Sequence, residues 1–396
     1  MMARPERIFI AAAEPSGDVL GAELIDALRA RAPDVVIAGV GGAQMTARGV
    51  VSPFDISELS VLGIAEGVKA YGRVKARAAE TAAEAAAFGA DAAVLIDSWG
   101  FMVRVAWRLK ADAPEIARIK YVAPQVFATR QGRAKTLAEA ADHLLAIHPF
   151  DAPYFEPHGL TTTFVGNPAL ARDLSGDGAA FRTRHGIGAD EEMLLMLFGS
   201  RRSELERLFE PFAAAAGRLK EARPETRLVT VLSPSIADAA RALIAAEPSL
   251  SELIVVDGAQ KLDAFHAADV ALACSGTVTL ELARLGVPTI AAYRVGWVTW
   301  FLARFFLMKA KYISLANIAA DEALIPEYIQ MDCTGDRLAG AAYAMLEDAR
   351  GRAALSERLR EVTRVMAGEG GDPATVAART VLDLVRGGHG SPSGPA

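Results

Sequence analysis

The stretch "DVALACSGTVTLELARLGVPTIAAYR" (residues 269–294) shows how this chain is built. An apolar run, "DVALAC", ends in a Ser-Gly turn, and a helix-like pattern leads from there to a second apolar run, "TIAAYR". Continuous apolar runs of this length, separated by helical patterns, are typical of parallel strands that are covered on both faces. The stretch therefore predicts a strand, a helix and a second, parallel strand.

Similar apolar runs recur along the 396 residues in two series. The first series of predicted strands comprises residues 7–13, 35–40, 92–97, 118–122, 143–147 and 161–166. The second series follows a Gly/Asp-rich stretch and comprises residues 193–199, 227–232, 252–258, 269–274 and 289–294. Strands that alternate with helices in this way predict an α/β protein with two doubly wound, Rossmann-like domains facing across a cleft.

The break between the two series sets the expected domain boundaries. We expect one domain over residues 1–168, completed by a C-terminal helix at 372–386, and a second domain over 169–371. Residues 387–396 are rich in Gly, Ser and Pro, which predicts a disordered tail. In doubly wound sheets, ligands bind beyond the carboxyl ends of the strands, so functional residues are expected in the loops that follow the predicted strands.

The composition is that of a soluble globular protein, with 52% apolar and 23% charged residues. The net charge of −6 provides no general basic field, so nucleic acid is not an expected partner. Cys274 and Cys333 lie far apart without metal-ligand spacing, and the six histidines are scattered, so we expect reduced thiols in a cytoplasmic protein and no metal site.

The quoted stretch contains the first candidate site. Gly276, Thr277 and Thr279 lie at the predicted helix start, where backbone N–H groups and the helix dipole favour an anion such as a phosphate. Glu281 lies one turn further along the same helix face, from where its carboxylate could reach the hydroxyl groups of a ribose. The alternative is that Thr277 caps the helix and Glu281 is a solvated acid.

A second loop of the same form precedes it in "MLFGSRRSELERL" (196–208). Gly199, Ser200 and Arg201 follow a predicted strand and open a helix, so that two anion sites in one domain would suit a diphosphate. The alternative is a surface helix with ion pairs between Arg201 and Glu204 and between Arg202 and Glu206.

The N-terminal half contains candidate acid–base residues. Asp97 ends a predicted strand in "IDSWGF", where a carboxylate could take a proton from an acceptor hydroxyl. The alternative role for Asp97 is the N-cap of the following helix. In "AAEPSGDVLGAELI", Ser16 and Gly17 form a similar tight turn after a strand, and Glu14 and Asp18 are second candidates for the base.

These segments together resemble the lipid-A-disaccharide synthase family, whose members are inverting glycosyltransferases of the GT-B architecture. The resemblance runs in order from about residue 9 to residue 335. It is carried by "AEPSGDVLGAELI", "GVGGAQM", "ELSVLGIAE", "IDSWGF", "YVAPQVFATRQGRAK", "FVGNP", "GSRRSEL", "SGTVTLELARLGVPTIAAYR" and "KYISLANI" with "IPEYIQ".

The resemblance implies the reaction and its setting. Family members transfer an acylated glucosamine from UDP-2,3-diacylglucosamine to the 6-hydroxyl of 2,3-diacylglucosamine 1-phosphate, which gives the β-1,6-linked lipid A disaccharide and UDP. The UDP-sugar is then a substrate, and neither a cofactor nor a metal ion is expected. By the same resemblance, the first domain takes the acceptor, the second takes the UDP-sugar, and the enzyme works at the cytoplasmic face of the inner membrane.

The resemblance also assigns residues by position. The family's catalytic aspartate falls on Asp97, its phosphate-contacting arginine on Arg201 and its nucleotide-side asparagine on Asn317. Further positions that match the family motifs are Ser16, Asp18, Ser275, Gly276, Thr277 and Glu281. The chain departs from the family pattern at Trp99, Gly100, Phe127, Thr129, Asn167, Phe198 and Ala316. Most of these departures lie in the acceptor half, so the acceptor preference is less constrained than the donor chemistry.

Two segments combine aromatic and basic residues, as expected of an enzyme with acylated substrates. The first, "WVTWFLARFFLMKAKY" (297–312), is interrupted by Arg304 and is too short to span a bilayer, but it could bind at a membrane surface. The second is "VKAYGRVKARA" (68–78). The alternative for both is a core helix or a helix at a homodimer contact. Other functions that remain open are a non-catalytic lipid- or nucleotide-binding homologue and a UDP-sugar epimerase.

Overall fold

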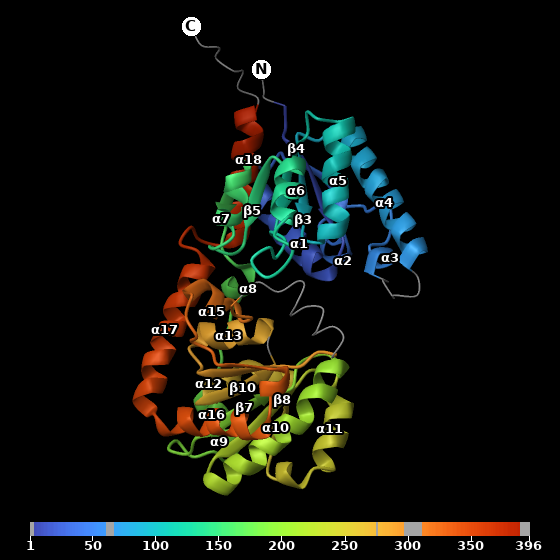
Figure 1. The fold of residues 1–396 in the computed structure, drawn as a ribbon. Helices are drawn as coiled ribbons and strands as arrows, with labels where there is room; N and C mark the ends of the chain where they lie inside the picture. Colours follow the sequence, from blue (N-terminus) through green and yellow to red (C-terminus); the bar gives the residue numbers. More distant parts are fainter. Residues whose placement is uncertain (1–3, 61–66, 275, 297–310, 389–396) are drawn as a thin grey trace. The chain divides into compact units, whose positions relative to one another are not determined.

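The computed structural model describes residues 4–60, 67–274, 276–296 and 311–388. The chain divides into two compact units (Figure 1). Unit 1 comprises Met1–Pro168 and Ala367–Ala396, and unit 2 comprises Ala169–Met366. Each unit contains one six-stranded sheet in which all neighbouring strands are parallel, so each is a separate α/β structure.

The sheet of unit 1 has the strand order β2-β1-β3-β4-β5-β6. Its strands are β1 (Arg7–Ala12), β2 (Val36–Val40), β3 (Ala92–Ile96), β4 (Ala117–Tyr121), β5 (His143–Ala146) and β6 (Thr161–Phe164). The order reverses at β1, because β2 lies on one side of it and β3 and the later strands lie on the other. Loops beyond the carboxyl ends of β1 and β3 therefore lie at the position where doubly wound sheets bind ligands.

Helices cover both faces of this sheet. One buried cluster joins the strands to α1 and α18, and another joins them to α4 and α5. The helices of unit 1 are α1 (Pro15–Arg31), α2 (Ala43–Thr46), α3 (Ser57–Ser60), α4 (Gly67–Phe88), α5 (Trp99–Asp112), α6 (Arg133–Ala140), α7 (Ala152–Phe155) and α18 (Pro373–Gly388). The last helix, α18, packs against α1, and it runs two residues beyond the helix predicted from sequence. The rest of the predicted tail, residues 389–396, lies outside the described residues.

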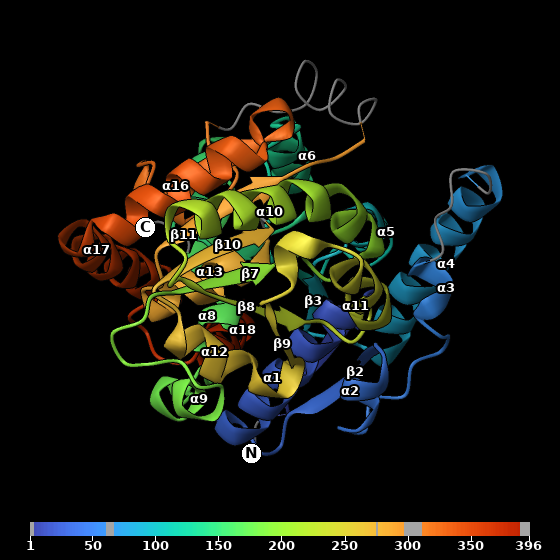
Figure 2. The same ribbon diagram turned by 90° about the horizontal axis from the view of Figure 1, so that it is seen from below.

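The sheet of unit 2 has the order β12-β11-β10-β7-β8-β9. Its strands are β7 (Met193–Leu197), β8 (Arg227–Leu232), β9 (Ile254–Asp257), β10 (Val270–Cys274), β11 (Thr289–Tyr293) and β12 (Glu327–Ile329). Figure 2 shows α10 and α16 on one side of this sheet and α12 and α13 on the other. The helices from the boundary onward are α8 (Pro168–Ala171), α9 (Gly178–Arg184), α10 (Arg202–Ala222), α11 (Ala237–Ala245), α12 (Lys261–Ala267), α13 (Thr277–Leu285), α15 (Leu315–Ala320), α16 (Gly335–Glu347) and α17 (Ala349–Ala367).

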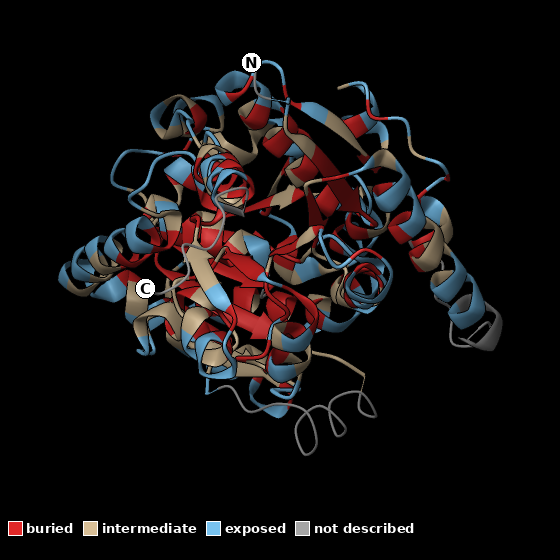
Figure 3. Cartoon of the chain, turned by 90° about the horizontal axis from the view of Figure 1, so that it is seen from above, coloured by how far each residue is buried: buried red, intermediate tan, exposed pale blue. Residues whose placement is uncertain are grey.

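All eleven strands predicted from the sequence are confirmed, with ends that shift by at most two residues. The central strands are buried on both faces, as their colouring in Figure 3 shows, and this explains why most of their residues are apolar. The missed strand is β12, Glu327–Ile329, which has only three half-buried residues at the edge of the sheet. A run this short and this polar gives no periodic signal.

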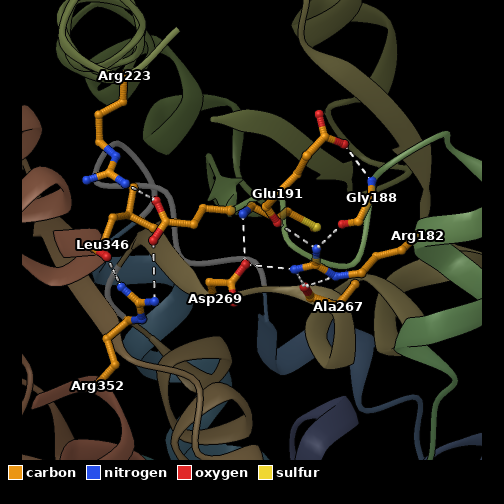
Figure 4. Close-up of polar contacts among 10 residues, drawn as sticks. Arg182, Gly188, Glu191, Arg223, Ala267, Asp269, Leu346 and Arg352 are labelled. Carbon is orange, nitrogen blue, oxygen red and sulfur yellow. Dashed lines mark hydrogen bonds and ion pairs between the residues drawn. The ribbon is translucent and has the colours of Figure 1, made fainter. Parts of the chain in front are cut away.

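Charged side chains organise the amino-terminal edge of the unit 2 sheet (Figure 4). Arg182 donates to the Asp269 carboxylate at 2.7 Å and to the main-chain oxygens of Ala267 and Glu191, both at 2.7 Å. Asp269 in turn accepts from the N–H of Met193 at 2.8 Å. Arg223 pairs with Glu192 at 2.6 Å, and Arg352 approaches the same carboxylate at 3.4 Å. These contacts satisfy main-chain groups where strands begin, at the edge opposite to the loops considered below.

No helix among the described residues is long and apolar enough to cross a membrane. The aromatic segment that the sequence marked for membrane binding lies mostly outside the described residues, because 297–310 are not among them.

Two glycines of unit 1 provide a matched test of the packing. A Cβ at Gly39 of β2 would lie 1.9 Å from the main-chain oxygen of Ile10, whereas a Cβ at Gly72 of α4 meets no described atom within 4 Å. We expect Gly39→Ala to lower the free energy of unfolding by about 1–3 kcal/mol, because strand β2 must move away from β1. Gly72→Ala should raise it by about 0.5–1 kcal/mol through helix propensity.

Urea unfolding followed by circular dichroism measures both changes. A Gly39→Ala variant as stable as the unchanged protein would contradict the close approach of the two strands.

Candidate active site

A cavity of about 510 Å³ lies at the carboxyl ends of the central strands of unit 2. It is formed by the loops after β7, β8, β9 and β10 and by the first turns of α12 and α13. Its polar and glycine lining residues are Gly199, Ser200, Arg201, Glu204, Ser233, Gly258, Lys261, Gly276, Thr277 and Glu281. The two loops that the sequence marked as anion sites therefore line one and the same cavity. Ser275 lies outside the described residues.

The loop after β7 is closed by Glu204 rather than left open. Glu204 Oε2 accepts from the N–H groups of Ser200 and Arg201 at 2.9 and 3.1 Å, and Glu204 Oε1 accepts from Arg201 Nη1 at 2.7 Å. Gly199 has a φ of 97°, and a Cβ there would lie 2.4 Å from Glu204. The expected main-chain anion site is thus occupied by a carboxylate of the same helix, because an acid at this position caps the helix start. The Arg201 guanidinium, with its side chain 77% exposed, is the group left to meet a ligand.

Both ion pairs of the alternative interpretation are present. Arg201 pairs with Glu204 at 2.7 Å, and Arg202 pairs with Glu206 at 2.9 Å. Arg201 and Glu204 also line the cavity, whereas Arg202 and Glu206 do not. Arg201 therefore forms an ion pair and also lines the cavity, whereas Arg202 forms only an ion pair.

The loop after β10 presents the start of α13 to the cavity. Gly276 is the N-cap residue, and Thr277 is the first residue of the helix, so Thr277 is not the cap that the alternative required. Thr279 is 3% exposed, and its hydroxyl donates to the Gly276 oxygen at 2.7 Å, which corrects the prediction that it faces a ligand. The helix start retains the dipole that favours a negative charge.

Glu281 forms an ion pair that the sequence analysis missed. Its Oε2 lies 2.6 Å from Nζ of Lys261, and its side chain is only 14% exposed, so it is not a solvated acid. Lys261 is the first residue of α12, directly after the loop that follows β9. The sequence could have indicated Lys261, because "GAQK" directly follows a predicted strand at the edge where ligands bind.

Asn317 does not line this cavity. It is fully buried, its Nδ2 donates to the Ile325 oxygen at 2.7 Å and to Glu327 at 3.1 Å, and its Oδ1 accepts from the N–H of Ile325 at 2.8 Å. Glu327 also accepts from the N–H of Ser314 at 2.7 Å. Because its amide is committed to this network, Asn317 shapes the loop between α15 and β12, and the expected direct nucleotide contact is not supported.

In unit 1, candidate residues meet where β1 and β3 end. Ala12 pairs in register with Ile96, which places Glu14 and Asp97 just beyond the ends of neighbouring strands. Glu14 and Ser16 are exposed, Gly17 is buried, and Asp97 is half-buried. The N-cap of α5 is Ser98 rather than Asp97, so the structural alternative for Asp97 is not supported.

Asp18 is engaged in a different role from the one predicted. It is 4% exposed, and its carboxylate accepts from the N–H groups of Gly42, Gln44 and Met45 at 2.8, 2.8 and 3.1 Å. These bonds hold the start of α2 against α1 and leave the carboxylate no open approach for an acceptor. The contacts therefore favour a structural role for Asp18, and Asp97 and Glu14 remain as candidate bases.

Two of the departures from the family pattern in unit 1, Phe127 and Asn167, are buried, whereas Trp99 and Thr129 are half-buried and Gly100 is exposed. Phe127 is 7% and Asn167 is 4% exposed, and Phe127 packs edge-on against the rings of His148 and Phe150. Burial lowers the pKa of His148 to about 4 and raises the pKa of the neighbouring Asp151 to about 7. The departure at Phe127 therefore lies in a cluster with side chains of the loop after β5.

Comparison with known proteins now identifies the family. A family model described as lipid-A-disaccharide synthetase matches residues 8–369. The chain belongs to the lipid-A-disaccharide synthase family. Lipid-A-disaccharide synthase of Paramagnetospirillum magneticum is 41% identical over 384 residues, which cover 96% of this chain and 97% of that protein. Membership of this family makes the chain a glycosyltransferase of lipid A biosynthesis.

Solved structures confirm the GT-B fold of this lipid-A-disaccharide synthase family member. The glycosyltransferase of kitacinnamycin superposes with a TM-score of 0.61 at 18% identity, covering 97% of this chain and all of that chain. UDP-GlcNAc 2-epimerase from Neisseria meningitidis, bound to UDP-GlcNAc, superposes with a TM-score of 0.58 at 9% identity and covers the same shares. At these identities the likeness extends to the fold alone.

Proposed function

We propose that this chain transfers the acylated glucosamine of UDP-2,3-diacylglucosamine to the 6-hydroxyl of 2,3-diacylglucosamine 1-phosphate, with a β-1,6-linked disaccharide and UDP as products. Unit 2 takes the UDP part of the donor, and unit 1 takes the acceptor. The observation that carries the proposal is the unit 2 cavity, which brings Arg201, the start of α13 and Glu281 to one place. Membership of the lipid-A-disaccharide synthase family supports the choice of lipid substrates.

The diphosphate and the ribose of UDP each have a chemically matched group in the cavity. The diphosphate lies at the start of α13, where Gly276 and Thr277 offer the positive end of the helix dipole, and next to the Arg201 guanidinium. The ribose hydroxyls donate to the Glu281 carboxylate, which Lys261 holds in place at 2.6 Å. Because a diphosphate competes with Glu204 for Arg201, donor binding is expected to loosen the pair that these two residues form.

The chemistry follows from these groups and from Asp97. The acceptor O6 gives its proton to Asp97 and bonds to the anomeric carbon, while the bond from that carbon to the β-phosphate oxygen breaks and its electron pair leaves with UDP. Glu14, at the end of the neighbouring strand, is the second candidate for the base. We propose that Arg201 and the dipole of α13 take up the charge on UDP, so that no metal ion is required. The described residues contain no cluster of three metal-ligating side chains.

UDP release by the purified protein tests this proposal. We expect release only when both lipids are supplied in mixed micelles, and we expect it to fall roughly 100-fold or more in Asp97→Asn, because an amide cannot accept the proton. Asp97→Asn should still bind UDP with unchanged affinity, which serves as the control for folding.

Other outcomes of the same assay point to the other functions. UDP binding without release would indicate a non-catalytic homologue. Turnover of a water-soluble UDP-sugar without a lipid acceptor would indicate an epimerase, for which the structural neighbours give no support beyond the fold.

Neighbouring arginines provide a matched test of the leaving-group site. Arg201 and Arg202 are both exposed and both paired with a glutamate, but only Arg201 lines the cavity. We expect Arg201→Ala to lower kcat roughly 100- to 1000-fold, as is typical when one preorganised donor is removed. Arg202→Ala should leave kcat unchanged. Steady-state rates of UDP release measure both, and equal losses in the two variants would rule out a specific role for Arg201.

We propose further that unit 1 contacts the membrane surface from which both lipids are drawn. Tyr71 on α4 and Trp107 on α5 are 56% and 40% exposed, and these helices pack side by side (Figure 1). Each ring has a cation close to it, with Arg104 5.2 Å from the Tyr71 centroid and Lys110 5.4 Å from the Trp107 ring. Exposed aromatic rings beside cations suit the interface of an anionic bilayer.

Co-sedimentation with vesicles that contain anionic lipid measures this contact. We expect Trp107→Asp to reduce the bound fraction severalfold, because it replaces an interfacial ring with a repelled charge. Tyr343→Asp is the control, since Tyr343 on α16 is a similarly exposed ring, 36% exposed, beside Arg223 in unit 2. Equal binding of both variants and the unchanged protein would exclude the α4–α5 surface.

A further inference from the structure

A lysine is buried in the interior of unit 1 and contacts the turn that contains Asp97. Lys120 is the fourth residue of β4 and is 2% exposed. Its register partners on the neighbouring strands are Leu95 of β3 and Leu144 of β5, both buried. A position between two leucines in a sheet that is covered on both faces calls for an apolar side chain, so a charged residue there requires a specific reason.

The Lys120 ammonium is fully bonded to the main chain. Its Nζ donates to the Asp97 oxygen at 2.7 Å, to the Tyr121 oxygen at 3.0 Å and to the Leu95 oxygen at 3.2 Å. A protonated lysine has three N–H donors, so the three carbonyl oxygens match them one to one. The bonds join the end of β3 to the end of β4 beneath the Asp97 turn.

The backbone that these bonds hold is strained. Asp97 and Ser98 have φ values of 48° and 33°, and Val122, at the end of β4, has a φ of 70°. Positive φ is uncommon outside glycine and is a genuine outlier for a β-branched residue such as Val122. Such conformations persist only where surrounding contacts hold them, and the Lys120 bonds to Asp97 and Tyr121 lie at this point.

We propose that Lys120 is a positioning residue for the proposed base, because its ammonium holds the left-handed turn that aims the Asp97 carboxylate out of the sheet. This inference rests on the proposed function, in which Asp97 takes the acceptor proton. Lys120 itself is buried and touches no substrate, so its effect on the reaction passes through the geometry of Asp97.

The protonation state of Lys120 then controls this geometry. Burial lowers the pKa of Lys120 to about 7, and the carboxylates of Asp97, beyond β3, and Glu14, at the start of α1, raise it against this effect. A neutral amine has only two N–H donors and cannot satisfy three carbonyls. As the pH rises through the pKa of Lys120, one of the three bonds is lost and the hold on the turn weakens.

The pH dependence of kcat in the unchanged protein is the first test. We expect kcat for UDP release to decline as the pH rises through about 7, as one proton is lost from Lys120. If kcat stays constant from pH 6 to pH 9, the claim that the protonation state of Lys120 controls the position of Asp97 is overturned.

The second test uses Lys120→Met, an unbranched side chain one atom shorter that has no donors, and Lys120→Gln in case the first variant folds poorly. We expect kcat to fall roughly 10- to 100-fold through misplacement of the base, with KM for the donor unchanged and the decline near pH 7 absent. Leu144→Ala is the matched control, because it removes buried volume beside Lys120 without touching the three carbonyls. It should lower Tm and leave the pH profile as it was.

The outcomes separate this inference from the proposed function. Asp97→Asn is assayed alongside, and if it retains full turnover, Asp97 is not the base and the proposed function fails. If Asp97→Asn is inactive while folded Lys120→Met keeps the kcat and the pH profile of the unchanged protein, the inference about Lys120 alone is overturned.

Discussion

Both units of this molecule depend on one constraint, which is that parallel strands bury both of their faces. Each strand must be followed by a helix that returns the chain to the same end of the sheet, so every strand–helix loop of a sheet lies at one edge. In unit 2 this geometry brings the loops after β7 and β10 together around one cavity, although Arg201 and Thr277 are 76 positions apart in the sequence. In unit 1 it places Glu14 and Asp97 at adjacent strand ends.

The same constraint explains how far the sequence could be interpreted. Buried strands are mostly apolar, so eleven strands and the two-domain α/β class could be predicted, while the short edge strand β12 could not. Glycine-rich turns after strands marked the loops around the cavity. The roles of single side chains were less predictable, because a pattern does not show where a side chain finds its partners. Asn317 matches a family motif and Thr279 lies at a predicted helix start, yet both are bonded internally.

The sequence analysis missed the main contacts of three charged residues, Lys261, Lys120 and Glu204. The sequence pattern does not show the partner of any of them. Lys261 meets Glu281 from another helix, and Lys120 meets carbonyls of two strands. Glu204 was considered only as the partner of a surface arginine, but it also closes a main-chain turn. The functional assignments of Asp97, Arg201 and Glu281 stay predictions, and they now have a defined geometry in which to be tested.

Unit 1 is built from two separate parts of the chain, one before and one after unit 2. This arrangement has a consequence for synthesis on the ribosome. Helix α18 packs against α1 and contributes Val381 and Leu382 to the buried cluster of β1 and β3, but it follows all of unit 2 in the sequence. Unit 2 is synthesised as one continuous segment and is complete before α18 emerges. The first unit to leave the ribosome is therefore the last to complete its core, and until then it exposes the apolar surface that α18 covers, which is the kind of surface that chaperones bind.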